Sequence, residues 1–426
     1  MKKQTDSIFT EVLQEVNPGI KDLAKIRNSL NSFLRKIDIK MKKLKIDASI
    51  FVGGSFAKNT LIKKDMYDID IFIRFNKKYS KTDISALTAK ILKGNKVIKL
   101  KGSRNYFKVV IGPHIFFEII PVIEVKKPSE AYNITDLSYS HVTYIKKKVK
   151  SDKILDGIKL AKAFCYANRC YGAESYIQGF SGYGLELLVY HYNGFLPFVK
   201  AMSKAKPSGK IVIDIEKKYK NKRHILMDIN ASKLDSPIVL IDPTYKQRNV
   251  SAALSDETFM KFQKACKKFL KKPSLKSFKL EKTDISKIKK NADSKKYEFL
   301  LLEARTKKQE GDIAATKLLK FYKHLSRQVE KYFFIKNSGF NYGGQKAARF
   351  FFVGKSREEL IISGPLTKQD QNVKKFKKAH KDTFKKLGRI YAREKITLNL
   401  EQFLEKWQRD DKRKIKDMYV SELKVI

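Results

Sequence analysis

Residues 68–75 read Asp-Ile-Asp-Ile-Phe-Ile-Arg-Phe, and they follow the glycine-rich stretch Gly-Gly-Ser-Phe-Ala-Lys-Asn-Thr at residues 53–60. Acidic and apolar side chains alternate in the first stretch with a period of two, which predicts a β-strand. Asp68 and Asp70 would then project from the same face. Two carboxylates placed this way suit a pair of divalent cations roughly 3.5–4 Å apart, which need bridging oxygen ligands.

The glycine-rich stretch continues a short apolar segment that begins at Ser49 and predicts a strand running into a turn. Gly54 lets the backbone approach a phosphate closely, because glycine has no side chain. Ser55 adds a hydroxyl donor and Lys58 adds a positive charge. The sequence therefore predicts a phosphate-binding turn ahead of the two aspartates.

A third carboxylate is expected from a neighbouring strand. Residues 107–111 and 115–121 predict a hairpin around Gly112-Pro113, and Glu118 lies inside its second strand. Each of these signals is weak alone, because surface strands often carry an Asp-x-Asp pair and Gly-Gly-Ser is usually only a turn. The ordered combination of turn, paired aspartates and later strand carboxylate favours an active site.

The chain is strongly basic. Lysine and arginine number 92 against 44 aspartates and glutamates, which gives a formal net charge of +48. Such a charge attracts polyanions, so nucleic acid is the first candidate partner and an anionic membrane the second. Most of the excess is lysine, so a biased genomic composition is a simpler alternative explanation.

Cysteine usage and hydropathy bear on the compartment. The three cysteines, Cys165, Cys170 and Cys266, are too few for a disulfide framework and form no zinc-binding pair. The first twenty residues have no continuous apolar core of the kind a signal peptide needs. No apolar stretch approaches the roughly 18–20 residues of a membrane helix. We therefore expect a soluble, cytoplasmic protein with no membrane partner.

Hydrophobic periodicity organises the rest of the chain. It predicts helices over residues 6–46 and 152–171, and short strands over 210–216, 224–229 and 238–241. Fourteen lysines between Lys261 and Lys296 suggest a domain boundary. Beyond it, the pattern predicts strands at 297–303 and 348–353, a helix carrying Leu318, Phe321, Leu325 and Val329, and helices near 373–387 and 400–413.

With the set quoted above, the sequence resembles the polymerase-β-like nucleotidyltransferases, and within them the archaeal-type (class I) tRNA CCA-adding enzymes. Residues 171–189, Tyr-Gly-Ala-Glu-Ser-Tyr-Ile-Gln-Gly-Phe-Ser-Gly-Tyr-Gly-Leu-Glu-Leu-Leu-Val, resemble that family's neck motif. Residues 242–255, Asp-Pro-Thr-Tyr-Lys-Gln-Arg-Asn-Val-Ser-Ala-Ala-Leu-Ser, resemble its next hallmark, and Ser363-Gly-Pro is similar to a tail segment. The resemblance covers residues 5–270 by recognisable motifs, and the remaining residues by length and general composition.

The resemblance implies an α+β fold. It would comprise a nucleotidyltransferase head with a small mixed sheet (residues 1–143), a largely helical neck (144–265), and an α+β body with a helical tail (266–426). The head would carry the catalysis, the neck would help to bind the nucleotide, and the body and tail would bind tRNA.

The resemblance also implies a role for each site residue. Asp68, Asp70 and Glu118 would be the catalytic carboxylates that bind Mg²⁺. The nucleotide-binding residues would be Gly54 and Ser55 in the triphosphate-contacting turn, where Lys58 adds charge, and Lys162 and Tyr171 at positions that contact the triphosphate. Arg248 would read the incoming base, and Ser138 and His141 would continue the pocket. The family usually has Asp where Glu118 stands and Thr where Ser138 stands, and Tyr139-Ser140 replaces a Pro-containing stretch.

Simpler interpretations exist for several of these residues. Lys162 fits the solvated face of a helix, and Tyr171 fits a packed aromatic, as does Tyr183. Arg248 fits an ion pair with a carboxylate such as Asp242, and His141 fits a packed histidine. The run Phe350-Phe351-Phe352 fits a core strand better than an RNA-stacking face.

The implied reaction is the addition of CCA to the tRNA 3′ end from CTP and ATP, with release of pyrophosphate. The expected partners are the acceptor arm and 3′ end of tRNA, and the sequence leaves a homodimer open. One alternative is another RNA 3′-terminal nucleotidyltransferase, such as a poly(A) polymerase or a terminal uridylyltransferase. The other is a non-catalytic RNA-binding protein on the same scaffold.

Overall fold

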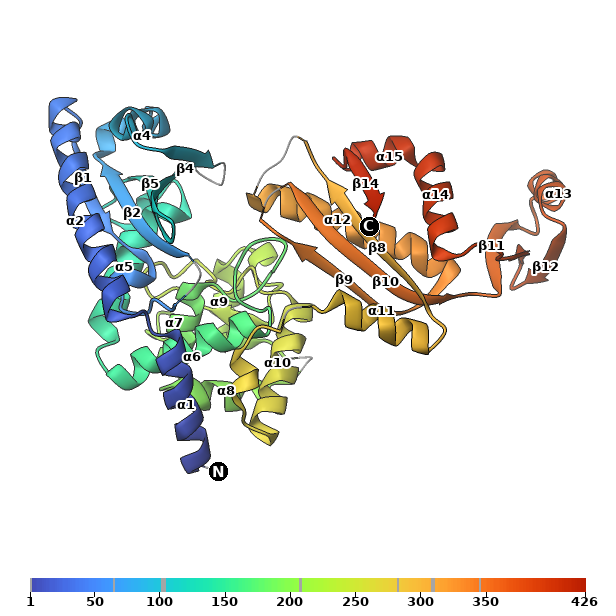
Figure 1. Ribbon diagram of the computed structural model, residues 1–426, viewed down its shortest axis with the longest axis horizontal. Coiled ribbons are helices and arrows are strands. Elements are labelled where there is room, and N and C mark those ends of the chain that lie inside the picture. The colour runs from blue at the N-terminus through green and yellow to red at the C-terminus, as the bar shows by residue number, and fades with distance from the viewer. Residues whose placement is uncertain are drawn as a thin grey trace. The chain divides into compact units, whose positions relative to one another are not determined.

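The chain folds into two compact units, Met1–Glu281 (unit 1) and Lys282–Ile426 (unit 2). The computed structural model, drawn in Figure 1, describes residues 2–63, 66–100, 105–206, 209–281, 283–307, 311–344 and 346–426. Each unit has its own hydrophobic cores. The boundaries predicted after residues 143 and 265 separate the head, the neck and the body by their expected functions. They stay a prediction.

The first part of unit 1 is built on a five-stranded mixed sheet of order β1-β2-β5-β4-β3. Its strands are β1 (Ala48–Val52), β2 (Tyr67–Phe75), β3 (Val97–Leu100), β4 (Tyr106–Gly112) and β5 (Ile115–Ile123). β2 and β5 pair in parallel, whereas the other neighbours are antiparallel. The predicted Asp-x-Asp strand and the predicted hairpin are both confirmed, and the parallel pairing makes them neighbours.

Helices cover one face of this sheet. They are α2 (Ile20–Lys43) and α4 (Ile84–Leu92), and a single helical turn, α3 (Gly54–Ala57), follows β1. α2 buries five apolar side chains at spacings of three and four, Ile26, Leu30, Phe33, Ile37 and Met41, as an amphipathic helix should. The ring of Phe33 lies 5.1 Å from that of Phe117 on β5, so the helix packs directly on the sheet that carries the carboxylates. Figure 1 shows α2 running alongside the strands.

The second part of unit 1 is mainly helical. It contains α5 (Ser138–Lys148), α6 (Asp152–Ala167), α7 (Gly182–His191), α8 (Phe195–Lys204), α9 (Lys222–Asp228), α10 (Asp256–Lys271) and the parallel pair β6 (Ile211–Ile213) and β7 (Ile238–Leu240). The first helix of the chain, α1 (Lys2–Val16), also packs on this core through Val12. Phe164 is fully buried there, with its ring 5.6 Å from Phe195 and 5.9 Å from Phe262.

Unit 2 contains a four-stranded antiparallel sheet of order β14-β8-β10-β9 and a three-stranded sheet of order β11-β13-β12. Their strands are β8 (Glu298–Arg305), β9 (Phe333–Tyr342), β10 (Ala347–Ser356), β11 (Glu359–Leu366), β12 (Asp382–Lys386), β13 (Arg389–Lys395) and β14 (Glu422–Val425). The helices are α11 (Ile285–Ser294), α12 (Gly311–Tyr332), α13 (Asp370–Ala379), α14 (Leu400–Asp410) and α15 (Lys412–Asp417). Phe350 and Phe352 on β10 are fully buried, so the core-strand interpretation of that aromatic run is confirmed.

Three sequence predictions of local structure were wrong. Residues 224–228 belong to α9 instead of a strand, because Asn221 caps the helix and accepts a hydrogen bond from the His224 N–H. The helix predicted to reach residue 171 ends at Ala167, and Arg169 takes a left-handed φ of 55°. The helix predicted over 373–387 ends at Ala379, and β12 begins at Asp382. Long helices and alternating strands were easier to predict than short elements.

The structure also describes the three cysteines and the helices that were considered as membrane spans. Cys165, Cys170 and Cys266 are free thiols, and all three are buried. Among the residues that the structure describes, no helix combines the length and the apolar character that a membrane span requires.

Truncating Phe164 tests the importance of the aromatic core in unit 1. We expect Phe164→Ala to lower the free energy of unfolding by about 3–5 kcal/mol, because the loss of a buried ring leaves a cavity. Ile20→Ala is the matched control, since Ile20 is 89% exposed. Urea unfolding followed by circular dichroism measures both changes, and equal effects of the two substitutions would contradict this description of the core.

Candidate active site

The predicted carboxylates lie side by side on two parallel strands. Asp68 and Asp70 are half-buried positions of β2 that alternate with the buried residues Tyr67, Ile69 and Ile71. In the register between β2 and β5, Asp70 is paired with Glu118. Side chains at paired positions project from the same face of a sheet, so all three carboxylates share one face.

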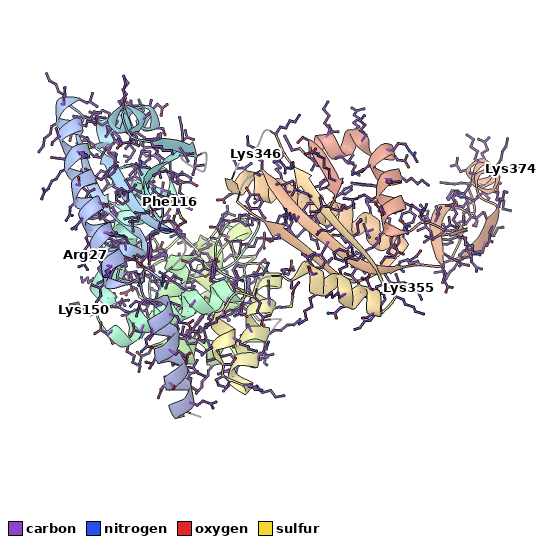
Figure 2. All side chains as sticks on the ribbon, viewed as in Figure 1. Arg27, Phe116, Lys150, Lys346, Lys355 and Lys374 are labelled. Atoms are coloured by element: carbon purple, nitrogen blue, oxygen red, sulfur yellow. The ribbon has the colours of Figure 1, made fainter. Side chains whose placement is uncertain are left out.

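A lysine that the sequence analysis did not single out accompanies them. Lys108 on β4 is paired with Glu118 across the antiparallel β4–β5 ladder. Its Nζ lies 3.9 Å from Asp68 Oδ1 and 4.0 Å from Glu118 Oε1. It also lies 3.7 Å from the centre of the ring of Phe116, which is labelled in Figure 2. The alternation along β4 was a usable signal, because it places Lys108 on the carboxylate face.

The glycine-rich turn is fitted directly against Asp70. The Gly53 N–H donates a hydrogen bond to the Asp70 carbonyl at 2.9 Å. Gly54 has a φ of +62°, and a Cβ built on it would fall 1.6 Å from Asp70 Oδ2. Both the backbone conformation and the lack of space therefore require glycine at this position. Ser55 lies in the single turn α3, and its carbonyl accepts a hydrogen bond from the Thr60 N–H at 2.9 Å.

Behind this turn lies a fully buried carboxylate, Glu186 on α7. Its Oε2 accepts from Lys58 Nζ at 2.6 Å, and its Oε1 accepts from Lys162 Nζ at 3.0 Å and from the Thr60 hydroxyl at 2.8 Å. Burial raises the pKa of Glu186, but the opposing charges of Lys162 and Lys58 outweigh burial and lower it to about 2. Glu186 is therefore ionised at neutral pH.

A second buried carboxylate, Asp242, gathers the residues of the other predicted cluster. Asp242 Oδ2 lies 2.7 Å from Arg248 Nη1 and 3.0 Å from His141 Nε2, whereas Oδ1 accepts from the Tyr183 hydroxyl at 3.2 Å. The backbone N–H and the hydroxyl of Thr244 each donate to Oδ1 at 2.8 Å. Burial raises the pKa of Asp242, but its contacts with His141 and Arg248 outweigh burial and lower it.

The contacts of Arg248 and His141 match the simpler interpretations considered for them. Arg248 pairs with Asp242, and His141 is a buried histidine whose ring stacks on Tyr183 at 4.3 Å. Burial lowers the pKa of His141 despite its carboxylate partner, so the ring is neutral at pH 7. Its Nε2 lies 3.0 Å from Asp242 Oδ2 and 3.1 Å from Arg248 Nη1. Neither contact tests the predicted role of these residues in nucleotide binding.

Lys162, Tyr171 and Ser138 complete the predicted set. The interpretation of Lys162 as a solvated helix residue is wrong, because it is 2% exposed and bonded to Thr60 and Glu186. Burial raises the pKa of the Tyr171 hydroxyl, and so do the charges of Glu186, Glu174 and Asp70. Ser138 begins α5, three residues before His141.

The two clusters are joined by α7. Tyr183 and Glu186 are three residues apart and therefore lie on one face of this helix. Tyr183 contacts Asp242, whereas Glu186 contacts the lysines and Thr60. Glu186 was not among the residues predicted from the sequence. Its signal was a single acidic residue inside the apolar run Leu185–Val189, because a charge in such a run must be paired when buried.

The donor set suits a hard divalent cation, because three carboxylates on one face offer the oxygen ligands that Mg²⁺ prefers. With the side chains as they stand, Lys108 Nζ lies between Asp68 and Glu118. Across the described ranges, no three His, Cys, Asp or Glu side chains are gathered closely enough to hold one ion. The residues fit the metal chemically, and the binding of a metal remains a proposal.

The fit of Gly54 against Asp70 gives a direct test of the site. We expect Gly54→Ala to displace the Asp70 carboxylate, because the added methyl group cannot share its space, and to add the strain of a left-handed backbone of roughly 1 kcal/mol. Catalytic activity should be largely lost, whereas the free energy of unfolding should fall only by the strain of the backbone. Gly94→Ala is the control, since Gly94 also has a positive φ, of +92°, but open space around it. Equal effects on activity would show that strain, and not the contact with Asp70, is responsible.

Solved structures with the same fold act on RNA ends. One is a cytoplasmic RNA terminal U-transferase, with a TM-score of 0.50 and 14% identity, which aligns with 66% of this chain and 99% of its own. Another is the Cid1 poly(U) polymerase bound to Mg 3′-dATP, with a TM-score of 0.51 and 14% identity, covering 66% of this chain and 100% of its own. At this identity the likeness shows the fold alone.

Sequence comparisons are more specific. Residues 156–279 match the family model of the tRNA nucleotidyltransferase second domain, and residues 1–148 match that of the Second Messenger Oligonucleotide or Dinucleotide Synthetase domain. A CCA-adding enzyme of Nanoarchaeum equitans is 42% identical over 212 residues, which is 49% of this chain and 52% of that protein, so this match spans about half of the relative. A CCA-adding enzyme of Methanocaldococcus jannaschii is 28% identical over 402 residues, 91% of this chain and 86% of that protein. The chain is similar to archaeal CCA-adding enzymes over nearly its whole length.

Proposed function

We propose that the chain is a template-independent tRNA nucleotidyltransferase that adds CCA to the tRNA 3′ end from CTP and ATP. The carrying observation is the placement of Asp68, Asp70 and Glu118 on one face of two adjacent strands, with the Gly53–Gly54 turn held against Asp70. Support for the substrate comes from relatives named CCA-adding enzymes, one of which aligns with 91% of this chain.

The proposed reaction is an in-line displacement. The tRNA 3′-hydroxyl attacks the α-phosphate of the incoming nucleotide, the bond to the β-phosphate breaks, and pyrophosphate leaves. Asp68, Asp70 and Glu118 would hold Mg²⁺, which lowers the pKa of the attacking hydroxyl and neutralises charge on the triphosphate. The turn with Gly54, Ser55 and Lys58 would orient the triphosphate, so that catalysis is mainly positioning and charge stabilisation.

Residues of the neck would hold the rest of the nucleotide. We propose that Arg248 reads the base edge, that Ser138 and His141 line the pocket, and that Lys162 and Tyr171 support the triphosphate site. Arg248 Nη1 donates a hydrogen bond to Asp242 Oδ2 at 2.7 Å. A guanidinium has five N–H donors, so a single occupied nitrogen leaves donors for a base.

The acceptor arm of tRNA is the proposed partner of unit 2, in a cytoplasmic reaction. Residues 282–426 contain 37 lysines and arginines against 18 aspartates and glutamates. Four lysines of the short helix α13 are exposed, Lys374, Lys375, Lys377 and Lys378. Figure 2 labels the first of them. Such residues bind phosphates without reading sequence, which suits a protein that recognises all tRNAs.

The proposed function is tested by the products. The chain is incubated with tRNA lacking its 3′ CCA, with Mg²⁺ and all four nucleoside triphosphates, and the new 3′ ends are sequenced. We expect CCA on most molecules. Homopolymer tails of A or U would instead identify another terminal nucleotidyltransferase, and tRNA binding without extension would favour a non-catalytic RNA-binding protein.

The carboxylates can be tested one by one. We expect Asp70→Asn to reduce incorporation by on the order of 100-fold or more, because an amide binds a hard cation poorly. Affinity for tRNA, measured by filter binding, should stay within about twofold. Glu118→Asp should keep measurable activity, since the ligand remains a carboxylate, whereas Glu118→Gln should not. An active Gln variant beside an inactive Asp variant would contradict the ligand role.

Arg248→Lys tests base recognition while keeping a cation beside Asp242. An arginine can donate to the ring nitrogen acceptors of cytosine and adenine, whereas uracil and guanine carry a proton there. We expect the variant to lose about 10- to 100-fold of its discrimination between CTP and UTP, by analogy with base-edge contacts worth about 1–3 kcal/mol. Single-turnover incorporation of each nucleotide measures this. If all four nucleotides slow equally, Arg248 has a structural role only.

A further inference from the structure

Glu186 is a buried charge inside an apolar helix. It is fully buried on α7, and so are its neighbours Leu185, Leu187 and Leu188. An ionised carboxylate in such surroundings is stable only when its oxygens are bonded to cations or donors. All of its described hydrogen bonds go to Lys58 and Thr60, which follow the glycine-rich turn, and to Lys162 on α6.

The two lysines differ in how many of their hydrogens are occupied. The described acceptors of Lys162 Nζ are the Thr60 carbonyl at 3.1 Å, the Thr60 hydroxyl at 2.8 Å and Glu186 Oε1 at 3.0 Å. Lys58 Nζ has a single described acceptor, Glu186 Oε2 at 2.6 Å. An ammonium group carries three donors, so Lys58 keeps two for a ligand.

The position of Lys58 and the charge around it also favour this lysine as a ligand of the triphosphate. It follows Gly54 by four residues, and Gly54 contacts Asp70, so Lys58 belongs to the turn that adjoins the carboxylates. Its side chain is 8% exposed, so the ammonium group lies in a largely desolvated setting. Two lysines and one glutamate leave a net charge of about +1 in this cluster, which attracts phosphate in a partly desolvated site.

We propose that Glu186 is a positioning residue for the triphosphate. It fixes Lys58 so that the two remaining N–H groups of this lysine bind the triphosphate of the incoming nucleotide. Lys162 fixes Thr60 and balances the charge of Glu186. This inference rests on the proposed function and names the residue that holds Lys58 in position for the nucleotide.

A double-mutant cycle separates positioning from structural support, since residues that act through one another give non-additive effects. The four proteins are the wild type, Glu186→Gln, Lys58→Met and the double variant. The measured quantities are the Kd of CTP with Mg²⁺, by calorimetry, and KM and kcat for CTP at saturating tRNA. Glu216→Gln is the matched control, because Glu216 also pairs with a lysine, Lys148 at 2.9 Å, and a tyrosine hydroxyl but lies outside the site.

We expect Lys58→Met to weaken CTP binding on the order of tenfold, as the loss of a charged hydrogen bond does, and Glu186→Gln to weaken it by a similar factor. The double variant should be no weaker than Lys58→Met alone, and Glu216→Gln should bind like the wild type. Multiplied effects in the double variant, or an unchanged Kd in Glu186→Gln, would overturn the proposal. If Glu186→Gln does not fold, Glu186→Asp replaces it, with the same criteria.

The outcomes also separate this inference from the proposed function. A wild type that extends tRNA while the cycle is additive leaves the function intact and removes the role of Glu186. A wild type that binds CTP with a non-additive cycle but extends no tRNA overturns the function and keeps the pairing of Glu186 with Lys58.

Discussion

The cost of burying a carboxylate constrains this structure more than any other single interaction. Glu186 and Asp242 are both fully buried, and each is stable only because cations and donors surround it. The partners of Glu186 come from the turn after β1 and from α6, whereas those of Asp242 come from α5, α7 and its own loop. Removing Glu186 would take away the carboxylate that two buried lysines share, and removing Asp242 would take away the ion-pair partner of Arg248. Five chain segments are thereby held in fixed positions around one site.

This constraint links the sheet that carries Asp68, Asp70 and Glu118 to the helical part of unit 1. The sheet supplies Asp68, Asp70 and Glu118 on one face through the parallel pairing of β2 and β5. The turn at Gly54 is fixed on one side by Asp70 and continues to Lys58 and Thr60, which are held by Glu186. A nucleotide bound at this turn would therefore meet groups whose positions are set before binding, which reduces the entropy lost in the transition state.

Much of the sheet and part of the site followed from sequence. The period of two predicted β2 and the side of it on which Asp68 and Asp70 lie, and the hairpin placed Glu118 in a strand. Pairing between β2 and β5 could not be predicted, because it depends on contacts between distant segments. For the same reason Lys162 was open to a solvated interpretation, since its buried partners Thr60 and Glu186 are 102 and 24 residues away. The short helix α9 was missed because its Asn221 cap outweighs an apolar pattern that fits a strand equally well.

A crystal structure of the chain with CTP and Mg²⁺ tests the central claim most directly. We predict metal coordinated by Asp68, Asp70 and Glu118, and a triphosphate that contacts the turn at Gly54 and Lys58 Nζ, with Lys58 still bonded to Glu186. Lys108, now between Asp68 and Glu118, should give way to the metal. A nucleotide bound away from the turn, or a metal held by other residues, would contradict the assignment of this site.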